Sequence, residues 1–180
     1  MGTNNLKIGS HAPDFNLPGV DGRKYSLNSF ADKKALVVIF SCNHCPYVQA
    51  YEERIREIQT EYASKGVSVV AINSNEDMGY PEDNFENMKK RAVEQKFNFP
   101  YLRDEDQSIA KAYDATHTPE IFLFDEYRNL AFHGKIDDNW QEPNKVQNQY
   151  LRNALDELLK GKEISVPETF TIGCTIKWKK

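Results

Sequence analysis

The pattern of hydrophobic and polar residues divides the chain into alternating strands and helices. Two short segments flank a turn rich in proline and glycine and predict a hairpin. A continuous apolar run with many β-branched residues is typical of a strand buried on both faces, and a second such run follows an amphipathic stretch of helical spacing. We predict the hairpin at 15–17 and 24–27, buried strands at 35–40 and 67–72, and a helix at 46–64 between these strands.

The second half of the chain continues this alternation. The pattern predicts a helix at 81–96, a short apolar segment at 99–102, a short helix at 107–113, an antiparallel pair of strands at 120–125 and 130–136, and a last helix at 145–159. The order strand, helix, strand is typical of a right-handed βαβ unit with a parallel pair. The predicted fold class is therefore α/β, with a central mixed sheet flanked by helices, an N-terminal hairpin and a helical insertion.

No internal repeat or long linker interrupts the sequence, so we predict one domain over residues 1–180. The tail at about 162–180 follows the last predicted helix, and we consider that it packs back on the domain.

Composition excludes several classes of function. The chain has 180 residues, of which 39% are hydrophobic and 28% charged, as in an ordinary soluble globular protein. Its formal charge of −4 does not indicate a basic surface of the kind that binds nucleic acid. The longest apolar run, Ala35–Phe40, is far shorter than the roughly 18 residues of a membrane span. We expect neither nucleic acid nor membrane as a partner.

Residues 1–7 are polar and predict no secretory signal, so we expect a cytoplasmic location.

Three cysteines are too few for a secreted disulfide scaffold, and their number is odd. Cys42 and Cys45 form a C-N-H-C motif where the first buried strand ends and the following helix begins, whereas Cys174 lies in the tail. The amides at a helix N-terminus favour a negative charge, so a thiolate at this place has a lowered pKa. The motif therefore predicts reactive sulfur chemistry.

The residues around the two sulfurs are suited to tune them. Pro46 suits the first position of a helix, which makes Cys45 the expected N-cap residue. His44 lies between the cysteines, beside Asn43, and its imidazole can hydrogen-bond to a thiolate or pair with it.

Two cysteines at this spacing can close a disulfide. We expect Cys42 to project towards solvent and attack a substrate disulfide, and Cys45 to lie under the helix and resolve the mixed disulfide. The alternative is part of a zinc site, completed by Cys174 and a histidine. No second C-x-x-C is present, and Pro46 stands where c-type haem attachment requires histidine.

Three motifs together resemble the thioredoxin superfamily, in the branch that holds peroxiredoxins and thioredoxin-like cytochrome-maturation reductases. They are the opening at Gly9–Leu17, the C-x-x-C motif, and Thr118-Pro119 before an apolar strand. The resemblance implies a thioredoxin-like fold and thiol–disulfide chemistry without a dissociable cofactor. It also implies that Pro119 is a cis-proline facing the sulfurs and that the backbone of Thr118 docks an extended substrate segment.

The chain departs from both parts of this branch. If Cys45 and the proline after it align with the Cys-Pro of peroxiredoxins, Cys42 takes the place of their threonine and Val38 that of their first proline. Thr118–Glu120 stands where the peroxide-activating arginine is expected, and Leu36 stands where thioredoxin has its buried acid. These departures weaken the prediction of a peroxide pocket and leave the proton acceptor for Cys45 unassigned.

Two further residues are candidates beside the motif. Cys174 is either a small buried hydrophobe or, if the tail folds back, a third redox partner or zinc ligand. His117, next to Thr118, can tune the sulfurs or make ordinary loop hydrogen bonds.

The leading hypothesis is a thiol-disulfide oxidoreductase that cycles a Cys42–Cys45 disulfide and serves cell redox homeostasis. Its expected partners are protein or small-molecule disulfides or thiols, with an unidentified reductant. The first alternative is a peroxiredoxin-like thiol peroxidase with an antioxidant role. The second is a carrier in which Cys42, Cys45 and a histidine hold zinc or copper.

Overall fold

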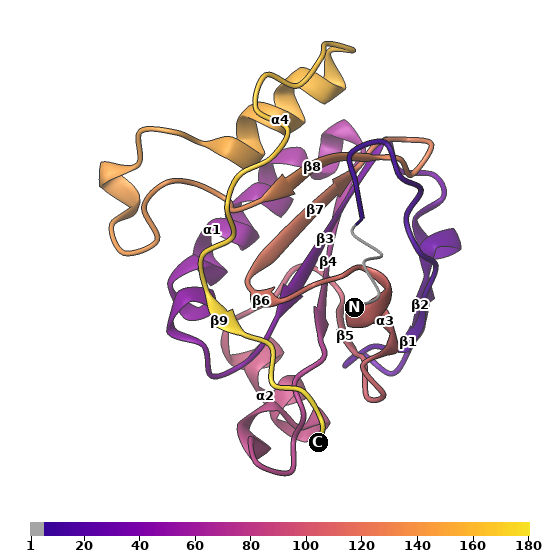
Figure 1. The fold of residues 1–180 in the computed structure, drawn as a ribbon, viewed down its shortest axis with the longest axis vertical. Coiled ribbons are helices and arrows are strands. Elements are labelled where there is room, and N and C mark those ends of the chain that lie inside the picture. Colours follow the sequence, from indigo (N-terminus) through magenta and orange to yellow (C-terminus); the bar gives the residue numbers. More distant parts are fainter. Residues whose placement is uncertain (1–5) are drawn as a thin grey trace.

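A five-stranded mixed sheet forms the centre of the computed structural model, which describes residues 6–180 (Figure 1). In the order β5-β4-β3-β7-β8, strands β3, β4 and β5 are parallel, whereas β7 and β8 are antiparallel to their neighbours. The strands of this sheet are β3 (Ala35–Ser41), β4 (Val67–Asn73), β5 (Tyr101–Arg103), β7 (Glu120–Phe124) and β8 (Leu130–Gly134). The predicted α/β class and the mixed sheet are confirmed.

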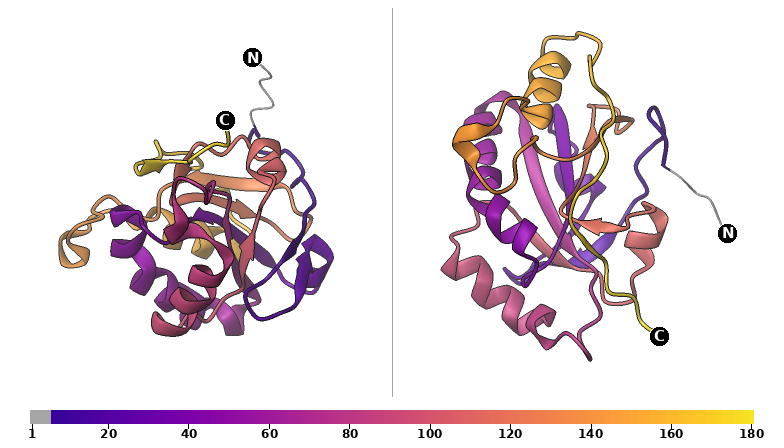
Figure 2. Two further views of the ribbon diagram at one scale, coloured as in Figure 1. Left: turned by 90° about the horizontal axis from the view of Figure 1, so that it is seen from below. Right: turned by 60° about the vertical axis from the view of Figure 1, so that its left-hand side comes forward.

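Helices cover both faces of the sheet (Figure 2). Three helices, α1, α2 and α4, pack on one face, while α3 and the predicted hairpin β1–β2 pack on the other. The helices are α1 (Pro46–Tyr62), α2 (Phe85–Glu94), α3 (Ser108–Ala112) and α4 (Tyr150–Leu159), and the hairpin strands are β1 (Asn16–Pro18) and β2 (Lys24–Ser26). No helix of the described part is long and apolar enough to span a bilayer.

Strand β3 is the centre of the core because both of its faces are covered. Val37 and Ile39 point into the cluster under α1, whereas Leu36, Val38 and Phe40 point into the cluster under α3. All five side chains are buried, which explains the uninterrupted apolar run in the sequence. The rigid strand ends at the C-x-x-C motif and fixes its position.

Two predicted helices are several residues shorter in the structure, whereas α1 and α3 differ from the prediction only by one or two residues at their ends. The helix predicted at 81–96 is split into a 3-10 turn (Pro81–Asp83) and α2, because Asn84 leaves the helical conformation and its side chain caps α2 by accepting the Asn87 amide. The last helix begins at Tyr150 rather than at 145, after a separate 3-10 turn.

Strand boundaries also differ from those predicted. β8 ends at Gly134, two residues earlier than predicted, and β5 is shifted towards the end of the predicted 99–102 segment. Residues 1–5, part of the polar stretch from which we predict no secretory signal, lie outside the described residues, and the cytoplasmic location stays a prediction.

The C-terminal tail folds back over the sheet. After α4 it runs alongside the domain and forms β9 (Cys174–Thr175), which pairs antiparallel with β6 (His117–Thr118) (Figures 1 and 2). Before β9, the backbone of His133 in β8 exchanges hydrogen bonds with Pro167 and Thr169, at 2.9 and 3.0 Å. The tail therefore covers the exposed edge of β8 and then the β6 segment.

Gly173 permits this close approach. A Cβ atom at this position would lie 2.1 Å from the Thr118 carbonyl oxygen, which is rigid backbone. The residue before β9 can therefore carry no side chain without moving the tail.

We predict that Gly173→Ala loosens the tail and destabilises the fold by about 1–3 kcal/mol, the usual cost of overpacking. Hydrogen exchange of the amides in β6 and β9 should become faster. The matched control is Thr175→Ala, whose side chain is exposed. Equal exchange in the Gly173→Ala variant and the wild type would contradict the assignment of this contact.

Candidate active site

The C-x-x-C motif forms the junction between β3 and α1. Cys45 is the N-cap of α1, with φ −75° and ψ 123°, and Pro46 is its first residue, as predicted. Both sulfurs are free thiols. The expectation that Cys42 projects towards solvent is wrong, because it is 1% exposed and Cys45 0%. Cys174 of the tail packs against the cluster that the two cysteines form with Val48, and so helps to cover them.

The Thr118-Pro119 segment contacts both sulfurs. Its peptide bond is cis, as the resemblance implies. The Thr118 hydroxyl lies 3.5 Å from the Cys42 sulfur, and the Cys45 thiol donates to the Thr118 carbonyl at 3.4 Å. The backbone edge expected to dock a substrate is occupied, since Thr118 pairs with Cys174.

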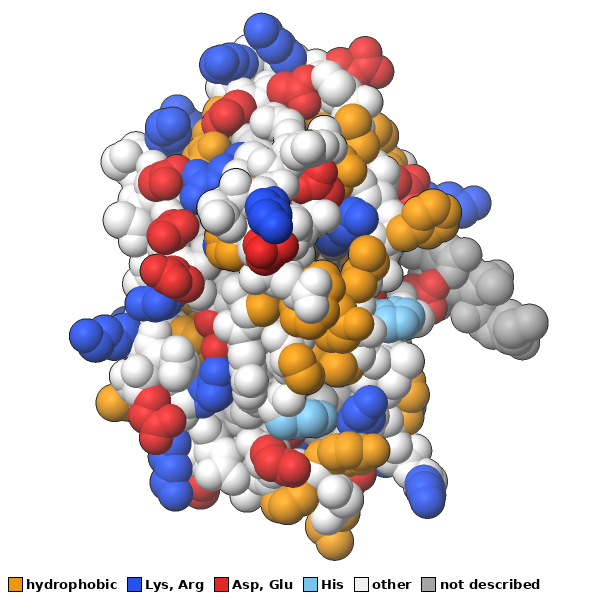
Figure 3. Space-filling view, turned by 90° about the vertical axis from the view of Figure 1, so that its left-hand side faces the viewer, with side chains coloured by type: hydrophobic (Ala, Val, Ile, Leu, Met, Phe, Trp, Pro, Cys, Tyr) orange, Lys and Arg blue, Asp and Glu red, His pale blue; other side chains and the backbone are white. Residues whose placement is uncertain are grey.

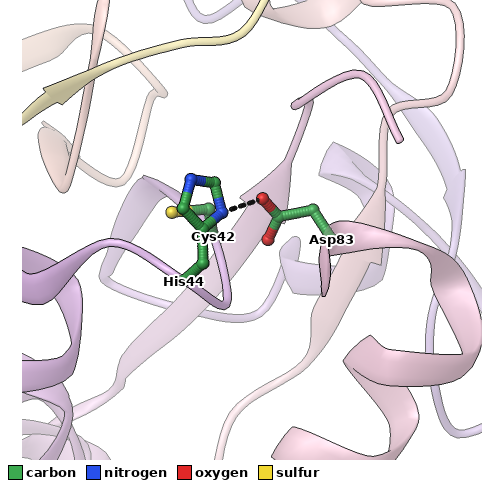
Figure 4. Close-up of side chains that lie close together, drawn as sticks. All are labelled: Cys42, His44 and Asp83. Carbon is green, nitrogen blue, oxygen red and sulfur yellow. Dashed lines mark hydrogen bonds and ion pairs between the residues drawn. The ribbon is translucent and has the colours of Figure 1, made fainter. Parts of the chain in front are cut away.

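Asp83 is the site residue that sequence reasoning missed. Its carboxylate is fully buried and accepts four hydrogen bonds. One oxygen accepts from the backbone N–H of Asn43 at 2.6 Å and from the side-chain amide of Asn73 at 3.2 Å. The other accepts from the Asn75 side chain at 3.0 Å and pairs with Nδ1 of His44 (Figure 4). Asp83 thus joins the C-x-x-C loop to the end of β4.

A signal for this acid exists in the sequence, although it is weak. Asn73-Ser74-Asn75 lies at the end of a buried strand, at the same sheet edge as the cysteines, and all three are buried. Buried amides need partners, and an acid in the insertion after β4 supplies them. Nothing in the local pattern distinguishes Asp83 from the exposed Glu82 beside it.

Asn43 and His44 position the loop. The Asn43 side chain accepts from the Tyr101 hydroxyl at 2.8 Å and donates to the Glu82 carbonyl at 2.7 Å. The His44 ring stacks on Tyr80, with centroids 5.4 Å apart, and its nitrogen is paired with Asp83. The imidazole predicted between the two sulfurs is therefore held by a carboxylate on the insertion.

The two thiols differ in acidity. Hydrogen bonding from Cys42 lowers the pKa of Cys45, against the effect of burial, and hydrogen bonding from Cys174 lowers it further. The same bond to Cys45, burial and the negative charge of Asp83 all raise the pKa of Cys42. The physical reason is position, because the N-cap residue beside the helix amides is Cys45, whereas Cys42 faces an acid.

Cys42, His44 and Asp83 place three possible ligand atoms within 4.8 Å of one another. Cys45 and Cys174, which the zinc hypothesis requires, are not in this group. Each Asp83 oxygen already accepts two hydrogen bonds, and three donors fall short of the four of a structural zinc site. We interpret the group as a hydrogen-bonded positioning cluster.

The segment around β6 carries a second buried acid. Glu120 accepts the backbone amides of Thr116 and His117 at 2.9 and 3.1 Å, and pairs with His133 at 2.6 Å. The ring nitrogen Nδ1 of His117 is hydrogen-bonded to the Thr116 hydroxyl at 2.8 Å. A buried carboxylate therefore stands in the segment where a peroxiredoxin arginine is expected.

Comparison with known proteins agrees with this geometry. Residues 7–150 match the Redoxin family. The chain belongs to this family. The thiol-disulfide oxidoreductase ResA of Geobacillus thermodenitrificans is 28% identical over 123 residues, 67% of this chain and 65% of that protein, so the match spans slightly less than two thirds of its length. Peroxiredoxin Bcp of Escherichia coli K12 is 28% identical over 159 residues, 76% of this chain and 96% of Bcp.

Solved structures resemble the Redoxin chain over nearly its whole length. An uncharacterized conserved protein from Geobacillus kaustophilus has a TM-score of 0.91 at 43% identity, covering 98% of this chain and 94% of its own. A hypothetical protein from Sinorhizobium meliloti has a TM-score of 0.90 at 40% identity, and the match covers 98% of this chain and 97% of that protein. A thiol:disulfide interchange protein from Chlorobium tepidum is 21% identical, with a TM-score of 0.67, and the match covers 85% of this chain and 98% of that protein. At this identity it shows the fold alone. The predicted redoxin branch and thioredoxin-like fold are confirmed.

We predict that Asp83→Asn lowers the pKa of Cys42, because it removes the negative charge that disfavours the thiolate. The measurement is the pH dependence of iodoacetamide alkylation in a Cys45→Ser/Cys174→Ser background, where Cys42 is the only thiol. Its midpoint should shift to lower pH. The variant should also lose about 1–3 kcal/mol of stability, since buried donors lose their acceptor.

The matched control is Glu82→Gln, which neutralises the adjacent, exposed acid. It should leave the alkylation midpoint in place. A midpoint that shifts equally in both variants, or in neither, would show that Asp83 has no specific effect on Cys42.

Proposed function

We propose that this Redoxin protein is a thiol-disulfide oxidoreductase that cycles between a Cys42–Cys45 disulfide and a dithiol. The observation that carries the proposal is the pair of free thiols at the N-terminus of α1, both of which contact Thr118 of the cis Thr118-Pro119 bond. The match to the ResA thiol-disulfide oxidoreductase supports it.

We assign the attack to Cys42, the first cysteine of the motif, and the resolving step to Cys45. Cys42 attacks the substrate disulfide, and its proton passes to the neighbouring Cys45 thiolate. The departing substrate thiolate takes this proton from Cys45. The Cys45 thiolate then attacks the Cys42 sulfur, the Cys42–Cys45 bond forms, and the second substrate sulfur leaves as thiolate. The lowered pKa of Cys45 serves this resolving step.

The surface around the site supports polypeptide substrates. Hydrophobic side chains gather on the face that carries α1 and the tail, with histidines beside them (Figure 3). Phe170 and Ile172 of the tail are 92% and 44% exposed. Apolar surface of this kind is typical of interaction sites.

A peroxiredoxin-like activity is the second candidate, because Bcp matches over 96% of its length. The buried Glu120, in the segment where the peroxide-activating arginine is expected, disfavours it, since peroxide reduction requires electropositive surroundings. Peroxide consumption under the conditions of the disulfide assay compares the two activities directly.

We predict that the protein accelerates insulin reduction by dithiothreitol, and that Cys42→Ser reduces the rate to that of buffer. Cys45→Ser should stop turnover but retain the attack, and incubation with glutathione disulfide should leave glutathione bound to Cys42. Peptide mass spectrometry identifies this adduct.

Cys42→Ser is the control for the trapping experiment, because it lacks the attacking sulfur. An equal amount of adduct in both variants, or wild-type turnover at the buffer rate, would contradict the proposed function.

A further inference from the structure

The third cysteine lies beside the redox pair. In the register of β6 and β9, Cys174 is directly opposite Thr118, whose carbonyl oxygen is 3.4 Å from the Cys45 sulfur. Cys174 also packs against the cluster that Cys42 and Cys45 form with Val48. The tail thus brings a third thiol to the C-x-x-C motif, although Cys174 and Cys45 are more than a hundred residues apart in the sequence.

The tail directly after Cys174 is held against the domain. Ile176 is buried in the core cluster under α3, and its amide donates to the Thr116 carbonyl at 2.9 Å. Asn75 accepts the Lys177 amide at 2.9 Å, and the Gln107 side chain donates to the Lys177 carbonyl at 2.9 Å. The position of Cys174 is therefore set by specific side chains.

Cys45 is within reach of Cys174, because its sulfur contacts the carbonyl of Thr118, the residue opposite Cys174, and Cys174 packs against the cluster of Cys42 and Cys45. Thiol–disulfide exchange requires such an arrangement, in which an attacking sulfur reaches one sulfur of a disulfide and displaces the other.

We propose that Cys174 is a third redox-active residue, which exchanges with the Cys42–Cys45 disulfide to form a Cys45–Cys174 disulfide. The proposal rests on the disulfide of the proposed function. Strand β9 then occupies the docking edge of Thr118 as a substrate segment built into the chain.

The exchange is balanced within the protein. Cys174 loses its proton and its thiolate attacks the Cys45 sulfur, so that the Cys45–Cys174 bond forms and the Cys42–Cys45 bond breaks. The electron pair leaves on Cys42, which takes up the proton. No external oxidant is needed, and the exchange returns Cys42 as a free thiol while the chain keeps one disulfide.

The surroundings favour the attack once the pair is oxidised. Burial raises the pKa of Cys174, and so do the hydrogen bond to Cys45 and the negative charge of Cys45. The last two causes disappear when Cys45 enters a disulfide, whereas the positive charge of Lys177 continues to lower the pKa. Cys174 therefore becomes more nucleophilic when its target forms.

The test is oxidation of Cys42→Ser with diamide, which accepts two electrons and two protons. We expect the full chain to lose both remaining thiols, to stay monomeric, and to yield a Cys45–Cys174 cross-link on peptide mapping. Cys45→Ser is the matched control. In that variant Cys42 and Cys174 should both stay alkylatable, because the sulfur that both contact is missing.

A Cys42→Ser protein that keeps two alkylatable thiols, or forms only cross-linked dimers, would overturn the inference. Oxidised wild type provides a second measurement that does not depend on the folding of a variant. It should contain the Cys45–Cys174 cross-link beside Cys42–Cys45, and its absence would also overturn the inference. If wild type forms neither disulfide, the proposed function itself fails.

Discussion

The arrangement of this site depends on one buried charge. Asp83 has no solvent contact, and a buried carboxylate is tolerated only when its oxygens are satisfied. Its donors come from the C-x-x-C loop and from the end of β4, so the requirement fixes the helical insertion against the sheet. The same charge raises the pKa of Cys42. One ionised group therefore sets both the geometry of the loop and the acidity of its first sulfur.

The tail is the second determinant of the site. In the thioredoxin superfamily the edge at the cis-proline docks substrates, but here β9 pairs with it. This pairing contributes to the burial of both motif sulfurs and brings the third cysteine to Cys45. The odd number of cysteines thus corresponds to one cluster of three sulfurs.

Much of the fold could be predicted because its signals are local. The apolar run of β3 is buried on both faces, and Pro46 starts α1 where its fixed φ favours a helix. The split of the helix at Asn84 could not be predicted from hydrophobic spacing, since it depends on a capping side chain. Asp83 and the pairing of Cys174 with Thr118 depend on long-range contacts, which local periodicity does not contain. The solvent exposure expected of Cys42 was wrong for the same reason, because a distant segment covers it.

A redox titration of the wild-type chain against dithiothreitol, with the free thiols counted by alkylation at each potential, tests the central claim most directly. If three clustered sulfurs share one disulfide, two of the three thiols disappear together in a single two-electron step and one stays alkylatable. Three thiols that remain free at every potential would contradict this account.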